Sequence, residues 1–159
     1  MVDSTTSRPQ LAPIRRPPIW LRVLMAFLGV PNIAIGLWAI ANPEHWFDNF
    51  LGWAPQVVAA YPPFNEHLAS DAGSGLLASG VVMTVAAVWP QRPVVITAAI
   101  AYLAFVLPHF LFHLINRSEL LTGAENASNS FSLALSVAGA AVVLLWQRRL
   151  EHSSNPETE

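Results

Sequence analysis

The sequence has no cysteine, no lysine and few charged residues of any kind. Without cysteine, disulfide bonds, thiolate metal sites and thiol redox catalysis are all excluded. Charged residues make up 11% of the 159 residues, against about 25% in a typical soluble domain. The net charge of -2 offers no basic surface, so nucleic acid is not expected as a partner. A hydrophobic share of 53% and a mean hydropathy of +0.44 indicate a protein whose solvent is the lipid bilayer.

Four long apolar stretches account for this composition. Each is close to the ~20 residues that a helix needs to cross a bilayer. They run approximately over residues 19–41, 68–89, 94–115 and 130–147. The sequence therefore predicts an all-α fold, an integral membrane four-helix bundle formed by residues 19–147. The flanking segments, 1–18 and 148–159, are polar and lack an apolar period, which is typical of disordered tails.

The arginines are distributed unevenly, and their distribution predicts the orientation. Four arginines precede or enter the first stretch, Arg92 lies in the second connection, and two more follow the fourth stretch. The first connection, residues 42–67, contains acids but no arginine. By the positive-inside rule, we expect both tails of this multi-pass membrane protein to be cytoplasmic. A cleaved signal peptide ending at residues 39–41 is disfavoured, because the apolar run exceeds the usual length of about 7–15 residues.

The first connection opens with a helix-start pattern. Asn42 can act as N-cap, Pro43 suits the first helical position, and Glu44 places an acid in the first turn. A run of aromatic residues follows and ends near Gly52. We expect a short helix that lies in the membrane interface with its aromatic side chains facing lipid.

Histidines and one aspartate are concentrated in the outer halves of the second and third long helices. His67 and Asp71 are four residues apart and share a helix face, as do His109 and His113. Because these helices form a hairpin with its turn near Gln91, the two pairs lie at similar depth. If both faces point into the bundle, three imidazoles and one carboxylate converge. Such a set is typical of transition-metal ligands, and an imidazole can also bind haem iron.

The same residues also allow simpler interpretations. Ionisable groups inside a membrane are costly and usually functional, but His109 and His113 could instead hydrogen-bond between helices and hold the bundle together. A proton relay or a site for an organic ligand is a further alternative. Under the metal hypothesis, Glu66 and His45 would support the ligands from outside; otherwise Glu66 belongs to a solvated helix start with Asn65 as N-cap. No catalytic residue can be named.

Several short motifs resemble those of the DoxX-like group, small four-helix membrane proteins of bacteria. They are Gly36-Leu37-Trp38 running into Asn42-Pro43-Glu44, Asn65-Glu66-His67-Leu68 with Asp71 and Gly73, and Pro108-His109-Phe110 with His113. The resemblance spans roughly residues 20–146 and concerns an uncharacterised subfamily. It implies an inner-membrane location and, for some members, a link to redox or oxidative-stress complexes. It transfers no catalytic residue to this chain.

Three functions compete on this basis. The first is a metal- or haem-binding membrane protein, acting as an oxidoreductase on a lipophilic substrate such as a quinone. The second is a non-enzymatic accessory or structural subunit, in contact with another membrane protein or with a second copy of itself. It predicts an exposed face of small residues on the fourth helix. The third, a small transporter, has the least support, because the sequence offers no inverted repeat.

Overall fold

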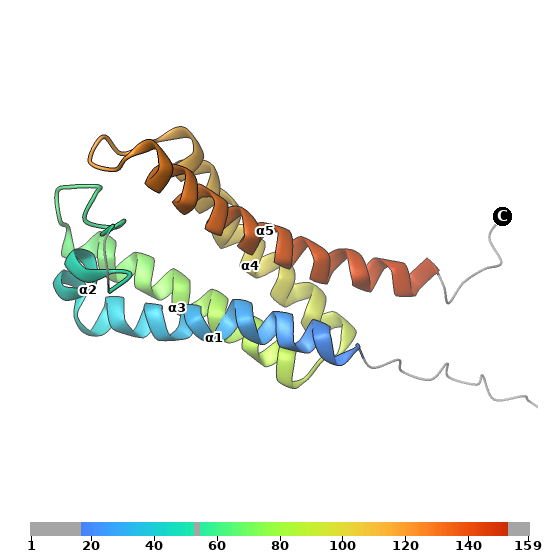
Figure 1. The fold of residues 1–159 in the computed structure, drawn as a ribbon. Helices are drawn as coiled ribbons and strands as arrows, with labels where there is room; N and C mark the ends of the chain where they lie inside the picture. Colours follow the sequence, from blue (N-terminus) through green and yellow to red (C-terminus); the bar gives the residue numbers. More distant parts are fainter. Residues whose placement is uncertain (1–16, 53–54, 153–159) are drawn as a thin grey trace, which may run out of the picture.

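The computed structural model describes residues 17–52 and 55–152, with side chains as far as Gln147, and its regular structure is helical throughout. The helices are α1 (Ile19–Ala41), α2 (Pro43–Asn49), α3 (Glu66–Val88), α4 (Arg92–Ile115) and α5 (Gly123–His152) (Figure 1). All but α2 are long and apolar enough to cross a membrane. The predicted all-α membrane bundle, with a short helix in its first connection, is confirmed. The predicted tails, 1–18 and 148–159, lie largely outside the described residues.

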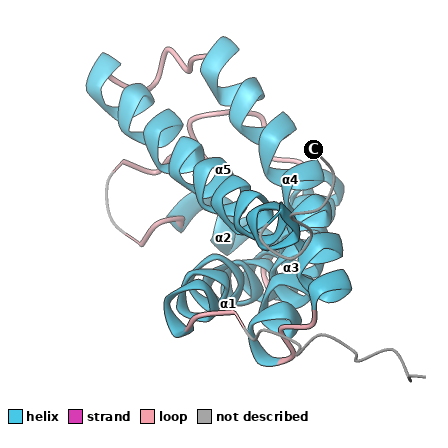
Figure 2. Cartoon of the chain, turned by 90° about the vertical axis from the view of Figure 1, so that its right-hand side faces the viewer, coloured by secondary structure: helices cyan, strands magenta, loops and turns pink. Residues whose placement is uncertain are grey.

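The four long helices form two pairs. α1 packs along α3 and α4 packs along α5, so that Figure 1 shows one pair below and the other above. The view in Figure 2 shows the same two layers. We call the end with the α1–α3 and α4–α5 connections the loop end, and the end with the tight α3–α4 turn the turn end. The two layers lie closer at the turn end and diverge toward the loop end (Figure 1).

Side-chain caps explain where α2 and α3 begin. The Asn42 side chain accepts a hydrogen bond from the backbone N–H of His45, and Pro43 takes the first helical position. The Asn65 side chain accepts one from the backbone N–H of Leu68 and starts α3. Each cap satisfies a backbone donor that the first helical turn leaves without a partner. Both helix starts agree with the patterns in the sequence.

Helix α5 is longer than predicted at both ends. It begins at Gly123 rather than near residue 130, because Thr122 and Glu125 form a capping box. The Thr122 N–H donates to the Glu125 carboxylate, and the Glu125 N–H donates to the Thr122 hydroxyl. At the other end the helix continues past the predicted limit at 147 to His152. This extension contains two arginines, a leucine and a glutamate, which are good helix formers.

Glycines allow α1 and α3 to pack with their backbones in contact. Gly29 and Gly36 on α1, and Gly73 and Gly80 on α3, are each seven residues apart and therefore share a helix face. A Cβ atom added at Gly36 would lie 2.6 Å from the Gly73 carbonyl oxygen, and one at Gly80 would lie 2.7 Å from that of Gly29. No side chain fits at such distances. The glycines therefore let α1 and α3 approach more closely than larger residues would allow.

The main hydrophobic core fills the turn half of the bundle. Its buried side chains come from the first halves of α1 and α4 and the second halves of α3 and α5, and include Met25, Met83, Tyr102 and Val143. Several others are alanines, which let the helices approach closely. The short α3–α4 connection holds the two layers together at this end. The longer connections at the loop end leave the layers free to separate there.

The aromatic side chains of α2 point into the bundle rather than toward lipid, contrary to our expectation. Trp46 is only 7% exposed and packs in a small cluster with Ala39 and Ala69. Phe47 and Phe50 are half-buried against the same cluster. The small side chains of α1 and α3 leave room at this level, and burying large aromatic rings there is more favourable than exposing them. Helix α2 thereby covers the loop end of the α1–α3 pair.

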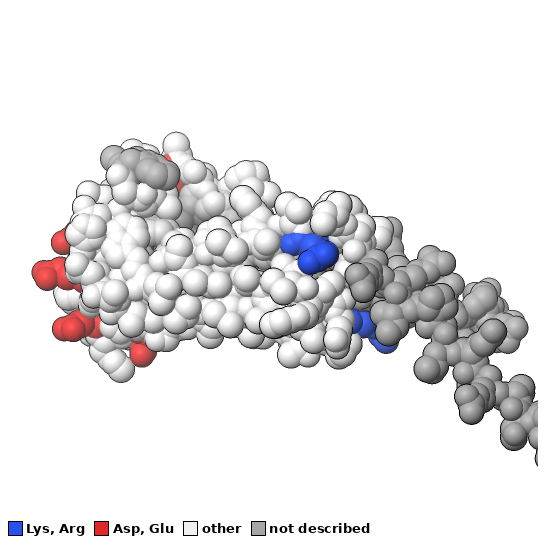
Figure 3. Space-filling view, turned by 90° about the horizontal axis from the view of Figure 1, so that it is seen from below, with Lys and Arg blue, Asp and Glu red and all other residues white. Residues whose placement is uncertain are grey.

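The two ends of the bundle differ in charge. Figure 3 shows acidic side chains at the loop end and arginines near the turn end of one face. Glu44 in α2 and Glu66 at the start of α3 belong to the loop end, while Arg22 and Arg92 lie in the first turns of α1 and α4. The Arg22 Nε donates to the carbonyl oxygen of Ala87 at 2.9 Å, so its charge is held close to the helix ends.

Candidate functional site

A cavity of about 930 Å³ lies in the loop half of the bundle, where the two helix layers diverge. Its lining residues come from the second half of α1, from residues 65–76 of α3, 105–113 of α4 and 124–136 of α5, and from α2 with the loop that follows it. Proteins bind small organic ligands in cavities of about 300–1,000 Å³. This cavity is therefore the candidate functional site.

The cavity has one wall that is largely polar and one that is largely apolar. The polar wall belongs to α4 and α5 and presents His109, His113, Ser128, Asn129, Ser132 and Ser136. The apolar wall belongs to α2, the loop after it and α3, and presents Trp46, Phe47, Phe50, Leu68, Ala72 and Leu76. A molecule held between these walls would meet hydrogen-bonding groups on one side and hydrocarbon or aromatic groups on the other.

His113 is tied into a hydrogen-bond network near the loop end of the polar wall. Its Nδ1 lies 3.0 Å from the Tyr61 hydroxyl and 3.3 Å from the side-chain amide of Asn129. The Tyr61 hydroxyl donates to the carbonyl oxygen of Asn116 at 2.9 Å. A phenol has one proton, and the Tyr61 proton is used in the bond to Asn116, so the Tyr61 oxygen can only accept a hydrogen bond from His113. His113 is therefore the tautomer that carries its proton on Nδ1. The Asn129 amide can turn to offer its oxygen to the same Nδ1–H.

His109 lies one helical turn deeper and has different surroundings. The centroid of its ring is 4.9 Å from that of His113 and 5.9 Å from that of Phe105. Within the described part of the chain, no group hydrogen-bonds to the His109 ring. A neutral imidazole carries one donor and one acceptor. His109 therefore keeps both for whatever occupies the cavity.

Residues 55–63, part of which lines the cavity, are hydrogen-bonded to the connection of residues 116–122, and we call these two connections the roof. Besides the Tyr61 bond to α4, the Ser118 hydroxyl donates to the carbonyl oxygen of Ala60. Burial raises the pKa of the Tyr61 hydroxyl, although a backbone hydrogen bond opposes this, so the group remains a donor near neutral pH. These bonds hold the two connections together between the cavity and the loop-end surface.

Buried Asn126 fixes the second half of the roof. Its Oδ1 accepts from the Ser118 N–H at 3.1 Å, and its Nδ2 donates to the Ser118 carbonyl oxygen at 2.9 Å. The same amide reaches the carbonyl oxygens of Leu121 and Thr122 at 3.1 and 3.2 Å. The Asn126 side chain thus supplies hydrogen-bond partners to backbone groups of this connection, which lies outside regular helix or sheet.

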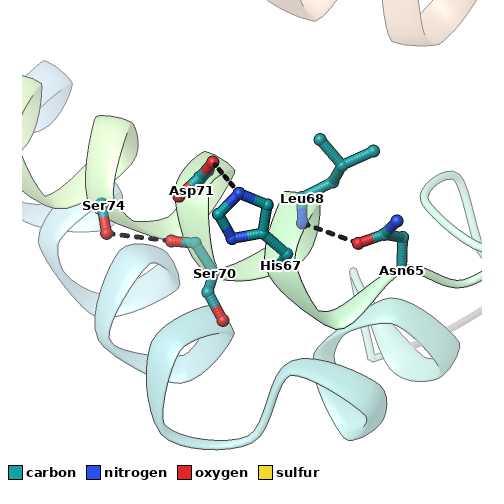
Figure 4. A network of polar contacts seen from close by, with 6 residues as sticks. All are labelled: Asn65, His67, Leu68, Ser70, Asp71 and Ser74. Atoms are coloured by element: carbon teal, nitrogen blue, oxygen red, sulfur yellow. Dashed lines mark hydrogen bonds and ion pairs between the residues drawn. The ribbon is translucent and has the colours of Figure 1, made fainter.

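The structure does not bring the four predicted metal ligands together. His67 and Asp71 pair with each other, with Nε2 3.4 Å from Oδ2 (Figure 4). Their side chains are 83% and 64% exposed, and neither lines the cavity. His109 and His113 do line it. The predicted metal site required both pairs to face the bundle, and only the second pair does so.

The rotation of α3 about its axis explains why the first pair faces outward. Gly73 and Gly80 must face α1, because only glycine fits there, and Ala72 and Leu76 face the cavity. Successive helix residues differ in direction by about 100°. These contacts leave Asp71 on the remaining face of α3, which is exposed.

The two groups predicted to support the metal ligands also lie outside the cavity. Glu66 is exposed at the start of α3. His45 is exposed on α2, where its Nδ1 accepts a hydrogen bond from the Trp38 Nε1 at 3.0 Å. In residues 17–52 and 55–152, no three His, Cys, Asp or Glu side chains form a group that could hold one metal ion.

The sequence analysis missed the polar face of α5. Ser128, Ser132 and Ser136 are spaced by four residues and line the cavity on one side of the helix. The Ser132 hydroxyl donates to the carbonyl oxygen of Asn129 at 2.8 Å, and the Ser136 hydroxyl to that of Ser132 at 3.3 Å. The spacing itself was a detectable signal, because polar residues repeated every four positions lie on one helix face.

Asn32 marks the inner limit of the cavity. A polar amide at this depth in the membrane needs a hydrogen-bond partner within the protein. The Asn32 Nδ2 lies 3.5 Å from the Ser79 hydroxyl oxygen. Beyond this polar group the main core begins.

Comparisons of the chain with models of protein families, with curated proteins and with solved structures give no match.

Proposed function

We propose that this integral membrane protein binds a small amphipathic molecule in the cavity between its two helix layers. The observation that carries the proposal is the two-walled cavity, with histidine, serine and asparagine side chains facing aromatic and aliphatic ones. An amphipathic molecule has a surface that matches both walls. Cavities with a mainly apolar lining and a few placed polar groups are typical of sites for such ligands.

The routes to the cavity favour a ligand that dissolves in the membrane. The roof lies between the cavity and the loop-end surface, and α2 covers the end of the α1–α3 pair. Among the described residues, the backbones of α3 and α5 make no close contact. The cavity is therefore enclosed between these two helices by side chains only. A molecule dissolved in the bilayer can approach through this side.

Filling the cavity from α3 tests the proposal. Ala72 lines the cavity, whereas Ala78 on the same helix is exposed. Ala72→Trp would place an indole inside the cavity, and Ala78→Trp would place the same group on the outer face. The wild type and both variants would be purified in mild detergent. Liquid chromatography with mass spectrometry would then compare their bound small molecules with those of the surrounding membrane.

We expect one class of compound to be enriched with the wild type and with Ala78→Trp, and to be lost from Ala72→Trp. Thermal unfolding of the three proteins shows whether each variant is folded. The proposal fails if all three carry the same molecules in the proportions of the surrounding membrane. A folded Ala72→Trp variant that keeps the enriched compound would also reject the cavity as its binding site.

A redox role is a second proposal, and it is supported by the histidine pair alone. Two imidazoles that face one cavity, with centroids 4.9 Å apart, can contribute to a transition-metal or haem site if further ligands come from outside the predicted set. The test is the metal content and visible spectrum of the purified protein beside a His109→Ala/His113→Ala variant. A stoichiometric metal or haem band lost in the folded variant supports it. A colourless protein that stays empty after metal addition rejects it.

The accessory-subunit hypothesis makes a prediction about the surface of α5. It predicted an exposed face of small residues on α5. Ala140 is instead fully buried, and a Cβ at Gly139 would contact the Leu28 methyl groups at 3.3 Å. Ala127 and Ala138 of the same helix are exposed. We place ligand binding first because the two-walled cavity supports it directly.

The location and family of the chain belong to the same proposal. We place the protein in the plasma membrane with both termini cytoplasmic, because the first turns of α1 and α4 carry arginines and the loop end carries acids. We also propose membership of the DoxX-like group, on the motifs around Gly36, His67 and His109.

A further inference from the structure

The charges around the cavity restrict what it can bind. No arginine is among the described residues that line it, and the chain has no lysine. Arg22 and Arg92 lie at the turn end, away from the cavity. An anionic head group would therefore lose its hydration without gaining a cation as partner, which is strongly unfavourable in a medium of low dielectric. Carboxylates and phosphates are poor ligands for this site.

The one carboxylate that lines the cavity is already engaged. The Glu125 Oε2 accepts hydrogen bonds from the N–H and the hydroxyl of Thr122, both at 2.8 Å, and so caps α5. It lies one helical turn before Asn129, which contacts His113. His109 is a further turn deeper, so about two turns, or ~11 Å, separate it from the carboxylate. A cationic head group at His109 would have no adjacent counter-charge.

At the depth of His109, the other polar side chains of the wall already have hydrogen-bond partners within the protein. The Ser132 and Ser136 hydroxyls already donate to carbonyl oxygens of α5, and His113 is engaged with Tyr61. Within the described chain, the His109 ring has no such partner. A neutral imidazole N–H needs an acceptor, and a ligand oxygen can supply one.

We infer that the cavity selects an uncharged amphiphile whose head group carries a hydrogen-bond-accepting oxygen, such as a ketone, ester or ether. The oxygen is held by the N–H of His109, and the hydrocarbon part lies along Leu76 and the aromatic side chains of the apolar wall. This inference rests on the proposed function and narrows it to one class of ligand. His109 is then the residue that determines head-group specificity.

Three probes with similar chains and different head groups test the inference. They are 2-tridecanone, which is neutral, dodecylamine, which is cationic, and dodecanoate, which is anionic. Native mass spectrometry of the full-length protein in one detergent would give the bound fraction at each probe concentration. The variants would be His109→Phe, which removes the N–H, and His109→Gln, which keeps an amide donor. His67→Phe is the matched control, because His67 is 83% exposed and lies outside the cavity.

We expect the ketone to bind one-to-one and at least about tenfold more tightly than either ion. His109→Phe should weaken ketone binding by about tenfold, the worth of one hydrogen bond. His109→Gln should restore much of it, and His67→Phe should change nothing. The inference is overturned if dodecanoate or dodecylamine binds as well as the ketone, or if His109→Phe binds the ketone like the wild type.

The outcomes also separate this inference from the proposed function. If all three probes bind equally and Ala72→Trp abolishes the binding of each, the cavity binds amphiphiles without head-group selection, and only the inference fails. If no probe binds the folded wild type and Ala72→Trp changes nothing in its bound molecules, the proposed function fails as well. A loss of folding in His109→Phe would show as a lower unfolding temperature, and His109→Gln then decides the question.

Discussion

Replacing Gly36 with alanine should force α1 away from α3. The added Cβ would lie 2.6 Å from the Gly73 carbonyl oxygen, 2.6 Å from the Leu77 amide nitrogen and 3.0 Å from the Leu77 Cα. All three are backbone atoms, which cannot rotate aside as a side chain can. To bring these contacts from 2.6 Å to an ordinary 3.4 Å, the helices must separate locally by about 0.8 Å.

Two opposing effects set the magnitude. Forcing an extra carbon into a close-packed interface costs about 1–3 kcal/mol. Alanine in place of glycine in a helix returns about 0.5–1 kcal/mol, because it restricts the unfolded chain. Because the contacts at Gly36 are all with backbone atoms, the cost lies in the upper part of its range, about 2–3 kcal/mol. We therefore expect Gly36→Ala to lower the free energy of unfolding by about 1–2.5 kcal/mol. Gly29→Ala, which meets the Thr84 hydroxyl at 2.5 Å and the Gly80 carbonyl oxygen at 2.8 Å, should behave similarly.

Reversible unfolding in mixed micelles, followed by circular dichroism, measures this difference. Gly139→Ala is the matched control, because its Cβ would meet only flexible side-chain methyl groups, those of Leu28 at 3.3 Å and one of Leu24 at 3.6 Å. Gly123→Ala meets nothing within 4 Å and controls for helix propensity. Both should stay within about 0.5 kcal/mol of the wild type or exceed it. A Gly36→Ala protein as stable as the wild type, or a Gly139→Ala protein equally destabilised, would refute the close α1–α3 contact.

Three further predictions concern the roof, the helix ends and the orientation. Asn126→Ala removes the side chain that satisfies the backbone of residues 118–122, and should cost about 1–3 kcal/mol in the same unfolding assay; a loss below about 0.5 kcal/mol would contradict the network. Arg22→Gln loses the 2.9 Å bond to a carbonyl of α3 and should cost about 1 kcal/mol, and an unchanged stability would show that the bond contributes nothing. Because the chain has no cysteine, a single introduced cysteine is the only thiol that a maleimide can label. An impermeant maleimide should label Glu119→Cys in intact cells and Gln91→Cys only after permeabilisation. The reverse pattern would show that the proposed orientation is inverted.

Much of the fold could be predicted from local sequence. A run of about 20 apolar residues must become helical in a bilayer, because no water is present to satisfy the backbone. The predicted span 19–41 coincides with α1, and the N-caps Asn42 and Asn65 start α2 and α3 as expected. The start of α5 is also determined by local sequence, through the capping box of Thr122 and Glu125. The prediction placed this start too late, because the apolar run begins after the helix does.

The candidate site depended on tertiary structure. The four-residue spacings correctly place His67 with Asp71 and His109 with His113, because spacing sets the relative directions of side chains within one helix. Spacing does not determine how a helix is rotated about its axis relative to its neighbours. For α3, the contact of Gly73 and Gly80 with α1 decides that rotation and turns Asp71 outward. The cavity exists because the two helix layers are held close at the turn end and diverge toward the loop end. This separation arises from how the helices pack together, so no local pattern in the sequence predicts it.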